Sequence, residues 1–411
     1  MINDINVFYH YNSAEKIKLG SLSLIKGTTY FAYDKEYLAK GINLSPFKLE
    51  FHDKVQTSSN PRINFGLPGL FYDSLPDGWG LLLIKKHLES IEVDFSNMSG
   101  LDLLSYIGDR GMGALSYEPD NKASVTPILD LASFAEEAAK IQKGGTSQLL
   151  AELLSGGGSP GGARPKALIG FNEKEDEIIV GATNYPKGYR PWLVKFAGID
   201  DSAQDAIFEH LILEHGKKAN IRSEPSKLIT DAKGNQWFAT QRFDRGAHGE
   251  RFHIHSLAGL FNLDFRQPNL DYGHLLNVTH NITKGSKEDV AQAVKLMTYN
   301  VLIGNRDDHV KNFSFLMKEG AWCLAPAYDI TFNNAHNGSH TMTVKGKDKG
   351  ITRRDIMDLA ESYFTRKEAG SLIDEVLAVA SCLKKEIKGL GIKKSLFEHI
   401  ENMESALSHK N

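Results

Sequence analysis

A polar segment between two apolar runs is the feature that most constrains this chain. Residues 304–312 read GNRDDHVKN, and the apolar runs 299–303 and 313–316 flank them. We therefore expect a loop held by two rigid elements, a setting in which catalytic groups often lie. Asp307 and Asn312 have the D-x4-N spacing of the protein kinase catalytic loop, where the Asp takes the proton of the substrate hydroxyl and the Asn binds magnesium. The motif is short enough to occur by chance.

A second carboxylate follows in the segment 324–330, LAPAYDI. Asp329 lies seventeen residues after Asn312, and the runs 313–317 and 321–324 between them predict two short strands. A hairpin that brought Asn312 and Asp329 together would make an all-oxygen site suited to Mg²⁺. Glycine does not follow Asp329, so this is not the DFG motif. A turn with a solvated Asp is the alternative.

The segment 156–166 is rich in glycine, with five glycines in the seven residues from Gly156 to Gly162. Its backbone amides could form an anion-binding nest, and Arg164 and Lys166 add positive charge. The segment matches neither of the two common phosphate-binding glycine motifs. Its composition also fits a flexible linker.

A lysine lies in the apolar run 192–196, WLVKF. An ammonium in an apolar strand needs a partner. Fourteen residues after Lys195, Glu209 lies in an amphipathic helical pattern, and protein kinases hold a strand lysine with a helix carboxylate in this way. A single solvent-facing lysine is the alternative, but the five features in this order favour a kinase-like phosphotransferase. His253 and His255 lack a third metal ligand nearby, which favours core or surface histidines.

Length and composition predict a folded protein of several parts. At roughly 100–200 residues per domain, 411 residues correspond to two to four domains or lobes. We expect an α+β fold with a β-rich N-terminal subdomain at 1–118, a strand-rich small lobe at 119–250 and a helical lobe at 251–411. The net charge is −3, which does not indicate nucleic acid binding. Without an apolar stretch of ~20 residues or a signal-peptide pattern, we expect a cytoplasmic, non-membrane protein.

Several stretches together resemble the HipA family of bacterial serine/threonine kinase toxins. They are GLFYDSLPDGWG at 69–80, GDRGMGALSY at 108–117, SPGGARPKA at 159–167, WLVKF at 192–196, QRFDR at 241–245, GNRDDHVKNFS at 304–314 and LAPAYDI at 324–330. The resemblance implies a two-lobed, protein-kinase-like fold that uses ATP and Mg²⁺.

The same resemblance implies roles for single residues. Asp307 would be the catalytic Asp, Asn312 and Asp329 would hold magnesium, and Lys195 would contact the phosphates. The remaining nucleotide-binding positions would be Gly161, Gly162, Ala163, Arg164, Pro165 and Lys166 in the phosphate-covering loop, Gln241, Arg242 and Phe243 in the hinge that meets adenine, and Asp308, His309 and Tyr328 near the catalytic Asp. Ser159 matches the serine at which family members autophosphorylate, which expels the loop and inactivates the enzyme. Pro160, which follows Ser159, departs from the family pattern.

The family also implies a substrate and partners. Its known substrates are aminoacyl-tRNA synthetases, whose phosphorylation arrests translation and growth and is linked to persistence. A helix-turn-helix antitoxin neutralises the toxin, so operator DNA would be contacted only indirectly, through that antitoxin. A kinase-like co-repressor with little catalysis is the alternative, and a small-molecule kinase with this fold is a third possibility.

Overall fold

The chain forms two compact units, which are described separately. In the computed structural model, unit 1 comprises residues 1–206 and 227–263, and unit 2 comprises residues 207–226 and 264–411. The structure describes residues 2–10, 15–58, 62–120, 130–158, 160–175, 177–181, 185–199, 201–202, 204–267, 270–333, 336–390 and 394–409. Residues 1–118 and 119–250 lie in the same unit, apart from 207–226, so the finer division into subdomains stays a prediction.

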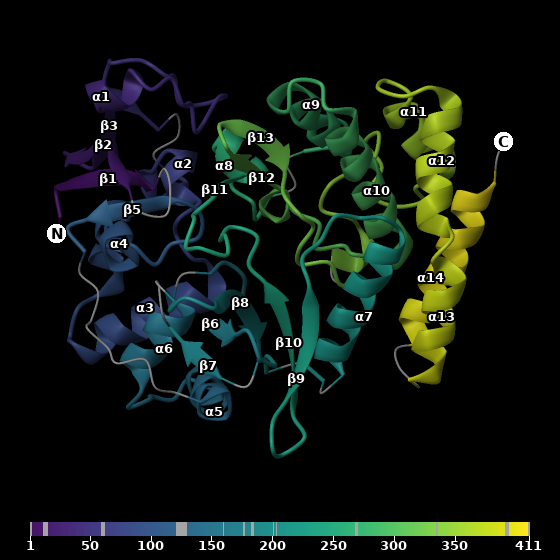
Figure 1. Ribbon diagram of the computed structural model, residues 1–411, viewed down its shortest axis with the longest axis horizontal. Helices are drawn as coiled ribbons and strands as arrows, with labels where there is room; N and C mark the ends of the chain where they lie inside the picture. Colours follow the sequence, from purple (N-terminus) through teal and green to yellow (C-terminus); the bar gives the residue numbers. More distant parts are fainter. Residues whose placement is uncertain are drawn as a thin grey trace. The chain divides into compact units, whose positions relative to one another are not determined.

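The first sheet of unit 1 is antiparallel, with the strand order β4-β3-β2-β1-β5 (Figure 1). Its strands are β1 (Asp4–His10), β2 (Lys16–Ile25), β3 (Thr28–Tyr33), β4 (Gln56–Thr57) and β5 (Leu115–Glu118). Lys26 and Gly27 both have positive φ and join β2 to β3, as a two-residue hairpin turn of the primed type requires. One face of the sheet buries Val7, Leu22 and Phe31.

The second sheet of unit 1 has the order β7-β6-β8-β10-β9. Its strands are β6 (Lys166–Asn172), β7 (Ile178–Val180), β8 (Tyr189–Lys195), β9 (Ser226–Thr230) and β10 (Gln236–Gln241). The expected strand that contains Lys195 is confirmed. Two helices precede this sheet in the chain, α5 (Leu131–Gln142) and α6 (Leu150–Gly157), and α6 packs against β6. One detail of the prediction was wrong: Gly156 and Gly157 belong to α6, so the loop is shorter than 156–166.

The remaining α-helices of unit 1 include the two that contain parts of the stretch 69–80, α2 and α3. They are α1 (Lys35–Leu38), α2 (Gly69–Tyr72), α3 (Gly78–Ser90), α4 (Gly100–Ile107) and α8 (Leu257–Phe261), with β11 (His253–Ser256) before α8. Asp77 directly precedes α3, so this helix begins within the stretch 69–80. A capping box between Ser99 and Asp102 begins α4, and such reciprocal bonds satisfy amides that have no partner within the helix.

Unit 2 is built around a buried helix, α10 (Lys287–Ile303), which packs against α9, α12 and α14. The other helices are α7 (Asp205–Lys218), α9 (Tyr272–Ile282), α11 (Arg353–Ala360), α12 (Arg366–Leu377), α13 (Ala380–Gly389) and α14 (Lys394–Ser408). Nearly every residue of α10 from Val290 onward is buried, as expected of a central helix that is covered on all sides. The hairpin of β12 (Ser314–Lys318) and β13 (Ala321–Leu324) confirms the two predicted strands.

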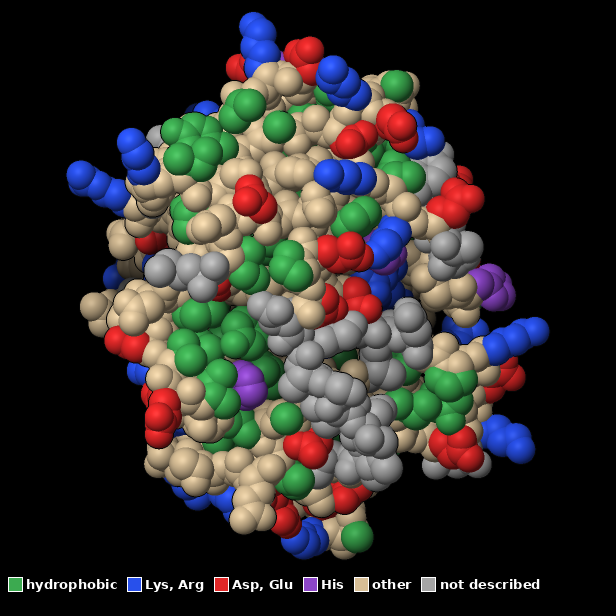
Figure 2. All heavy atoms as spheres, turned by 90° about the vertical axis from the view of Figure 1, so that its left-hand side faces the viewer, with side chains coloured by type: hydrophobic (Ala, Val, Ile, Leu, Met, Phe, Trp, Pro, Cys, Tyr) green, Lys and Arg blue, Asp and Glu red, His purple; other side chains and the backbone are tan. Residues whose placement is uncertain are grey.

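The distribution of charged side chains on the surface is consistent with the small net charge of the chain. On the face shown in Figure 2, the described basic side chains are dispersed among acidic ones and form no continuous basic area. No described helix is both long enough and apolar enough to span a bilayer.

Candidate active site

The polar segment 304–312 connects α10 to β12, as the sequence predicts. Gly304 ends α10 in the left-handed region, with φ of 69°, a conformation that glycine adopts at little cost. The residues that follow form a loop and then a 3₁₀ turn at Val310–Asn312, which His309 caps by accepting a 3.2 Å hydrogen bond from the amide of Lys311. The segment is therefore a loop between two rigid elements of unit 2.

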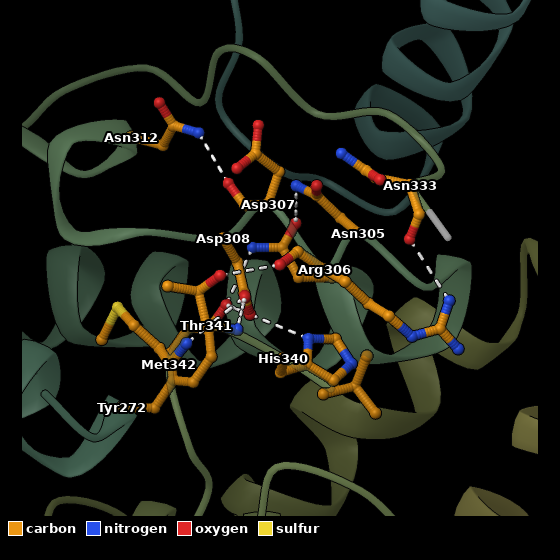
Figure 3. A network of polar contacts seen from close by, with 12 residues as sticks. Tyr272, Asn305, Arg306, Asp307, Asp308, Asn312, Asn333, His340, Thr341 and Met342 are labelled. Carbon is orange, nitrogen blue, oxygen red and sulfur yellow. Dashed lines mark hydrogen bonds and ion pairs between the residues drawn. The ribbon is translucent and has the colours of Figure 1, made fainter. Parts of the chain in front are cut away.

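Asp308 fastens the loop to the interior of unit 2. Its side chain is fully buried. One carboxylate oxygen accepts hydrogen bonds from the Tyr272 hydroxyl at 2.8 Å and the His340 ring at 2.9 Å. The other accepts from the amides of Thr341 at 2.8 Å and Met342 at 3.4 Å (Figure 3). Burial, and then the charge of Asp308, raise the pKa of Tyr272 well above its ordinary value, so this phenol remains a donor.

These contacts bear on the role of the Asp308 side chain. The sequence placed Asp308 among the nucleotide-binding residues, but four donors already occupy both of its oxygens. A buried carboxylate needs such partners, because an unpaired charge in the interior is very costly. The Asp308 side chain is thus an anchor of the loop.

Two further residues hold the start of the loop. Arg306 donates to the carbonyl oxygens of Gly338 at 2.9 Å and Asn333 at 3.3 Å. Asn305 donates to the side chain of Asn300 on α10 at 3.1 Å. The residues before Asp307 are therefore held by partners within unit 2, and one of them, Gly338, lies 32 residues away in sequence.

Asp307 points away from this network (Figure 3). Its side chain is 45% exposed, whereas Asp308 beside it is fully buried. The side-chain amide of Asn312 donates a 2.8 Å hydrogen bond to the Asp307 carbonyl oxygen, which ties the two ends of the D-x4-N motif together. Nε2 of His309 lies 3.9 Å from an Asp307 carboxylate oxygen. The loop thus presents one accessible carboxylate on a fixed backbone.

Tyr328 brings the segment of Asp329 to this loop. Its hydroxyl lies 2.8 Å from the carbonyl oxygen of Lys311 and 2.6 Å from the Ser314 hydroxyl, the residues on either side of Asn312 and Phe313. The expected approach of the two segments through a hairpin is therefore present. Asp329 itself has a φ of 55°, a left-handed conformation that is uncommon outside glycine but more frequent for Asp.

In unit 1, two lysines lie opposite each other at the end of the second sheet. Lys195 is paired in register with Lys166 on β6 and with Phe238 on β10, and its ammonium lies 5.7 Å from the Phe238 ring centre. Directly opposed residues in adjacent strands share a face, and like charges there are unfavourable. Two lysines on one face of the second sheet favour the binding of an anion to that face.

The glycine-rich loop is docked against the start of α3. Its Gly162 amide donates to the Asp77 carboxylate, and its Gly162 carbonyl accepts a 3.0 Å bond from the amide of Trp79. A Cβ on Gly78 would come within 2.6 Å of Ala163, so the close approach requires glycine there. The sequence alone assigned no role to the stretch 69–80. These contacts show that it holds the glycine-rich loop.

The other loop residues also bind within unit 1. The Lys166 ammonium donates to the Gly161 carbonyl. Arg164 forms a bidentate pair with Asp201, with both N–O distances at 2.9 Å. The carbonyl of Pro165 accepts a 2.9 Å bond from Phe196. In this conformation, these cations and the Gly162 amide make internal contacts, so their predicted role toward phosphates requires them to exchange partners.

The expected hinge directly follows β10. Gln241 and Phe243 are half-buried, but the Arg242 guanidinium is buried and pairs with Asp244 at 2.9 and 2.7 Å. Burial acts to raise the pKa of Asp244, but the charges of Arg242 and Arg245 outweigh it and hold that pKa well below its usual range. The Arg242 side chain therefore stabilises unit 1, and only its backbone remains available for the predicted contact with adenine.

Three further predictions have different outcomes. Glu209 lies on α7 and is buried, as the amphipathic pattern indicates. His253 and His255 are core histidines, as expected: the first bonds to the Leu44 carbonyl at 3.0 Å, and the second to Asp73 at 2.6 Å. Ser159 lies outside the described residues.

Comparisons with known proteins agree with this architecture. Residues 158–383 match the HipA-like C-terminal domain, and residues 13–118 match the HipA N-terminal domain. The chain therefore belongs to the HipA family. The HipA–HipB–operator DNA complex of Shewanella oneidensis contains a similar chain, with a TM-score of 0.69 and 16% identity over 98% of this chain and 95% of that one. The predicted α+β, protein-kinase-like fold is thereby confirmed.

A curated relative matches over a shorter stretch. The Sinorhizobium fredii protein named "Putative kinase Y4dM" is 33% identical over 97 residues. The match spans 23% of this chain and 23% of that protein.

Proposed function

We propose that this chain is a HipA-type serine/threonine protein kinase that transfers the γ-phosphate of ATP to a protein. The observation that carries the proposal is the contrast between two adjacent carboxylates. Asp308 is buried and fully bonded, while Asp307 is 45% exposed on the same anchored loop. A catalytic base needs this combination of a rigid backbone and an accessible carboxylate.

The residues beside Asp307 are suited to Mg²⁺. The amide nitrogen of Asn312 donates to the Asp307 carbonyl, which directs the side-chain oxygen the other way (Figure 3). With the Asp329 carboxylate, this oxygen would provide the hard ligands that Mg²⁺ prefers. A bound Mg²⁺ would neutralise phosphate charge during transfer. Asp307 would accept the proton of the substrate hydroxyl.

Unit 1 would bind the nucleotide phosphates. Lys166 and Lys195 are paired in register on adjacent strands, and the two positive charges on this face would attract a polyphosphate. The amides of Gly161 to Ala163 can add hydrogen bonds once the contact between Gly162 and Asp77 exchanges. The backbone of 241–243 would contact the adenine.

We further propose regulation by autophosphorylation of Ser159. Ser159 is two residues before Gly161 in the sequence. A Cβ on Gly161 would be 3.3 Å from the Asp77 carboxylate. A phosphate of about −2 charge on Ser159 would therefore be added close to an existing carboxylate and weaken the docking of the loop.

The substrate and partners follow from family membership. We propose an aminoacyl-tRNA synthetase as the target, with arrest of translation in the cytoplasm as the outcome. The Shewanella HipA structure contains HipB and operator DNA, which supports a helix-turn-helix antitoxin that also mediates contact with DNA. The same structure favours the alternative of a co-repressor with little catalysis.

Phosphate transfer from labelled ATP separates these alternatives. Wild-type protein should label itself or a synthetase, and Asp307→Asn should lower the rate by at least ~10²-fold while the fold is retained. Asp358→Asn, which alters an exposed carboxylate on α11, is the matched control. Growth arrest by the wild type and by Asp358→Asn, but not by Asp307→Asn, would support the toxin. Equal transfer by all three proteins would reject the site.

A further inference from the structure

Three potential metal ligands from two helices meet in unit 2, outside the loop 304–312. His215 lies near the end of α7, and Cys382 and Glu386 lie one turn apart on α13. One ligand atom from each residue lies within 4.8 Å of the other two. Residues four apart share a helix face, so α13 presents a thiol and a carboxylate to the imidazole of α7.

The imidazole of His215 has the environment of a ligand. Its side chain is fully buried, and its Nδ1 makes no hydrogen bond. Its Nε2 lies 3.2 Å from a carboxylate oxygen of Glu386. A buried polar group without a hydrogen bond costs about 1–3 kcal/mol. A bound cation would take the lone pair of one ring nitrogen and remove part of this cost.

The spacing of the ligand atoms fits a small tetrahedral ion. Zn²⁺ binds nitrogen and oxygen at ~2.0–2.1 Å and sulfur at ~2.3 Å, which gives tetrahedral edges of about 3.3–3.6 Å. The Nε2–carboxylate distance is 3.2 Å, and the distance from Cys382 Sγ to the other Glu386 oxygen is 3.6 Å. Small side-chain rotations would therefore complete three ligand positions. Because Cys382 is exposed, water can occupy the fourth.

We propose that His215, Cys382 and Glu386 form a Zn²⁺ site that joins α7 to α13. A thiolate and an imidazole select Zn²⁺ over Mg²⁺ or Ca²⁺, which prefer oxygen ligands alone. Binding would form three coordinate bonds and release the thiol proton of Cys382 to solvent. Lys218 lies 3.5 Å from Glu386 and is 54% exposed, so its ammonium can turn to water when the ion binds.

The two cysteines of the chain allow a matched test. Whole, metal-free protein would be titrated with Co²⁺, whose thiolate charge-transfer band reports a sulfur ligand, and then with Zn²⁺ by calorimetry. Wild type and Cys323→Ser should bind one equivalent, show the band and melt at a higher temperature with Zn²⁺. Cys382→Ser should lose the band and bind Zn²⁺ at least about 10–100-fold more weakly, since loss even of an outer-shell partner costs that much.

Two variants guard against loss of folding. Cys382 is exposed and Glu386 is 41% exposed, so Cys382→Ser and Glu386→Gln should keep the wild-type circular dichroism spectrum. Absence of stoichiometric Zn²⁺ binding to the wild type would overturn the proposal. An unchanged Zn²⁺ affinity in Cys382→Ser, or loss of binding in Cys323→Ser, would overturn it as well. The proposal does not depend on kinase activity.

Discussion

The side-chain amide of Asn312 donates a 2.8 Å hydrogen bond to the main-chain carbonyl of Asp307. The two ends of the D-x4-N motif are therefore joined through backbone and amide, and the Asp307 carboxylate is left to point elsewhere (Figure 3). This arrangement separates two roles within one loop, because Asp308 supplies the attachment. The separation has measurable consequences.

Asp308→Ala should destabilise unit 2 strongly. The change leaves the buried donors of Tyr272 and His340 without their acceptor, which costs about 1–3 kcal/mol for each unsatisfied group. Denaturant unfolding should show a lower free energy of unfolding for Asp308→Ala and almost no change for Asp307→Asn. Equal stabilities would contradict the role of Asp308 as an anchor.

Asp329→Ala should weaken binding of ATP in the presence of Mg²⁺ more than binding without it. A carboxylate that holds a divalent ion contributes mainly through that ion. Calorimetric titration under the two conditions measures the difference, with Asp348→Ala, an exposed carboxylate of the same unit, as the control. An equal loss with and without Mg²⁺ would indicate a structural role for Asp329.

Asp77→Ala should release the glycine-rich loop from α3. Removal of the acceptor for the Gly162 amide costs about 1–3 kcal/mol, so exchange of amide hydrogens in 160–166 should accelerate roughly 5–150-fold. Mass spectrometry of peptides from this segment would detect the change. Asp94→Ala, which removes the exposed carboxylate that caps Phe95–Asn97 in the same unit, should leave that exchange unaltered. Unchanged protection in Asp77→Ala would argue against the contact.

Incubation with ATP should place a phosphate on Ser159, with Ser155 as the other serine of the segment 155–166. The phosphorylated protein should bind ATP weakly and be cleaved by protease near this segment, because phosphate and nucleotide compete for the same amides and cations. Ser159→Ala should keep its affinity after the same treatment. Stoichiometric phosphorylation without loss of ATP affinity would reject expulsion of the loop, but would leave the kinase assignment intact.

The stability of unit 1 should fall as the pH drops below about 6.5. Burial lowers the pKa of His253 to about 3, so between these values the unfolded chain binds a proton that the folded chain does not. Stability is complete above the unfolded pKa and declines toward the folded one, by up to about 1.4 kcal/mol per pH unit for this residue. His253→Gln should flatten the dependence measured by denaturant unfolding at pH 4–7. The exposed control His248→Gln should retain the wild-type slope.

Local sequence patterns determined the elements that carry the candidate site. A short apolar run predicted the strand that ends at Lys195, and helical spacing predicted the helix that contains Glu209. The hairpin between Asn312 and Asp329 followed from two short apolar runs. These features depend on neighbours a few residues apart, so the chain order alone is sufficient to indicate them.

Tertiary packing decided which polar residues are accessible. Asp307 and Asp308 are adjacent and chemically identical, yet only Asp308 meets Tyr272 and His340, which lie 36 residues before it and 32 after it. The contact between Asp77 and Gly162 joins residues 85 positions apart. Such partners are brought together only when the chain packs, because the cost of burying a charge depends on which donors surround it. The sequence therefore determined where the candidate loop 304–312 lies, and the folded structure determined which of its carboxylates serves as anchor and which remains exposed.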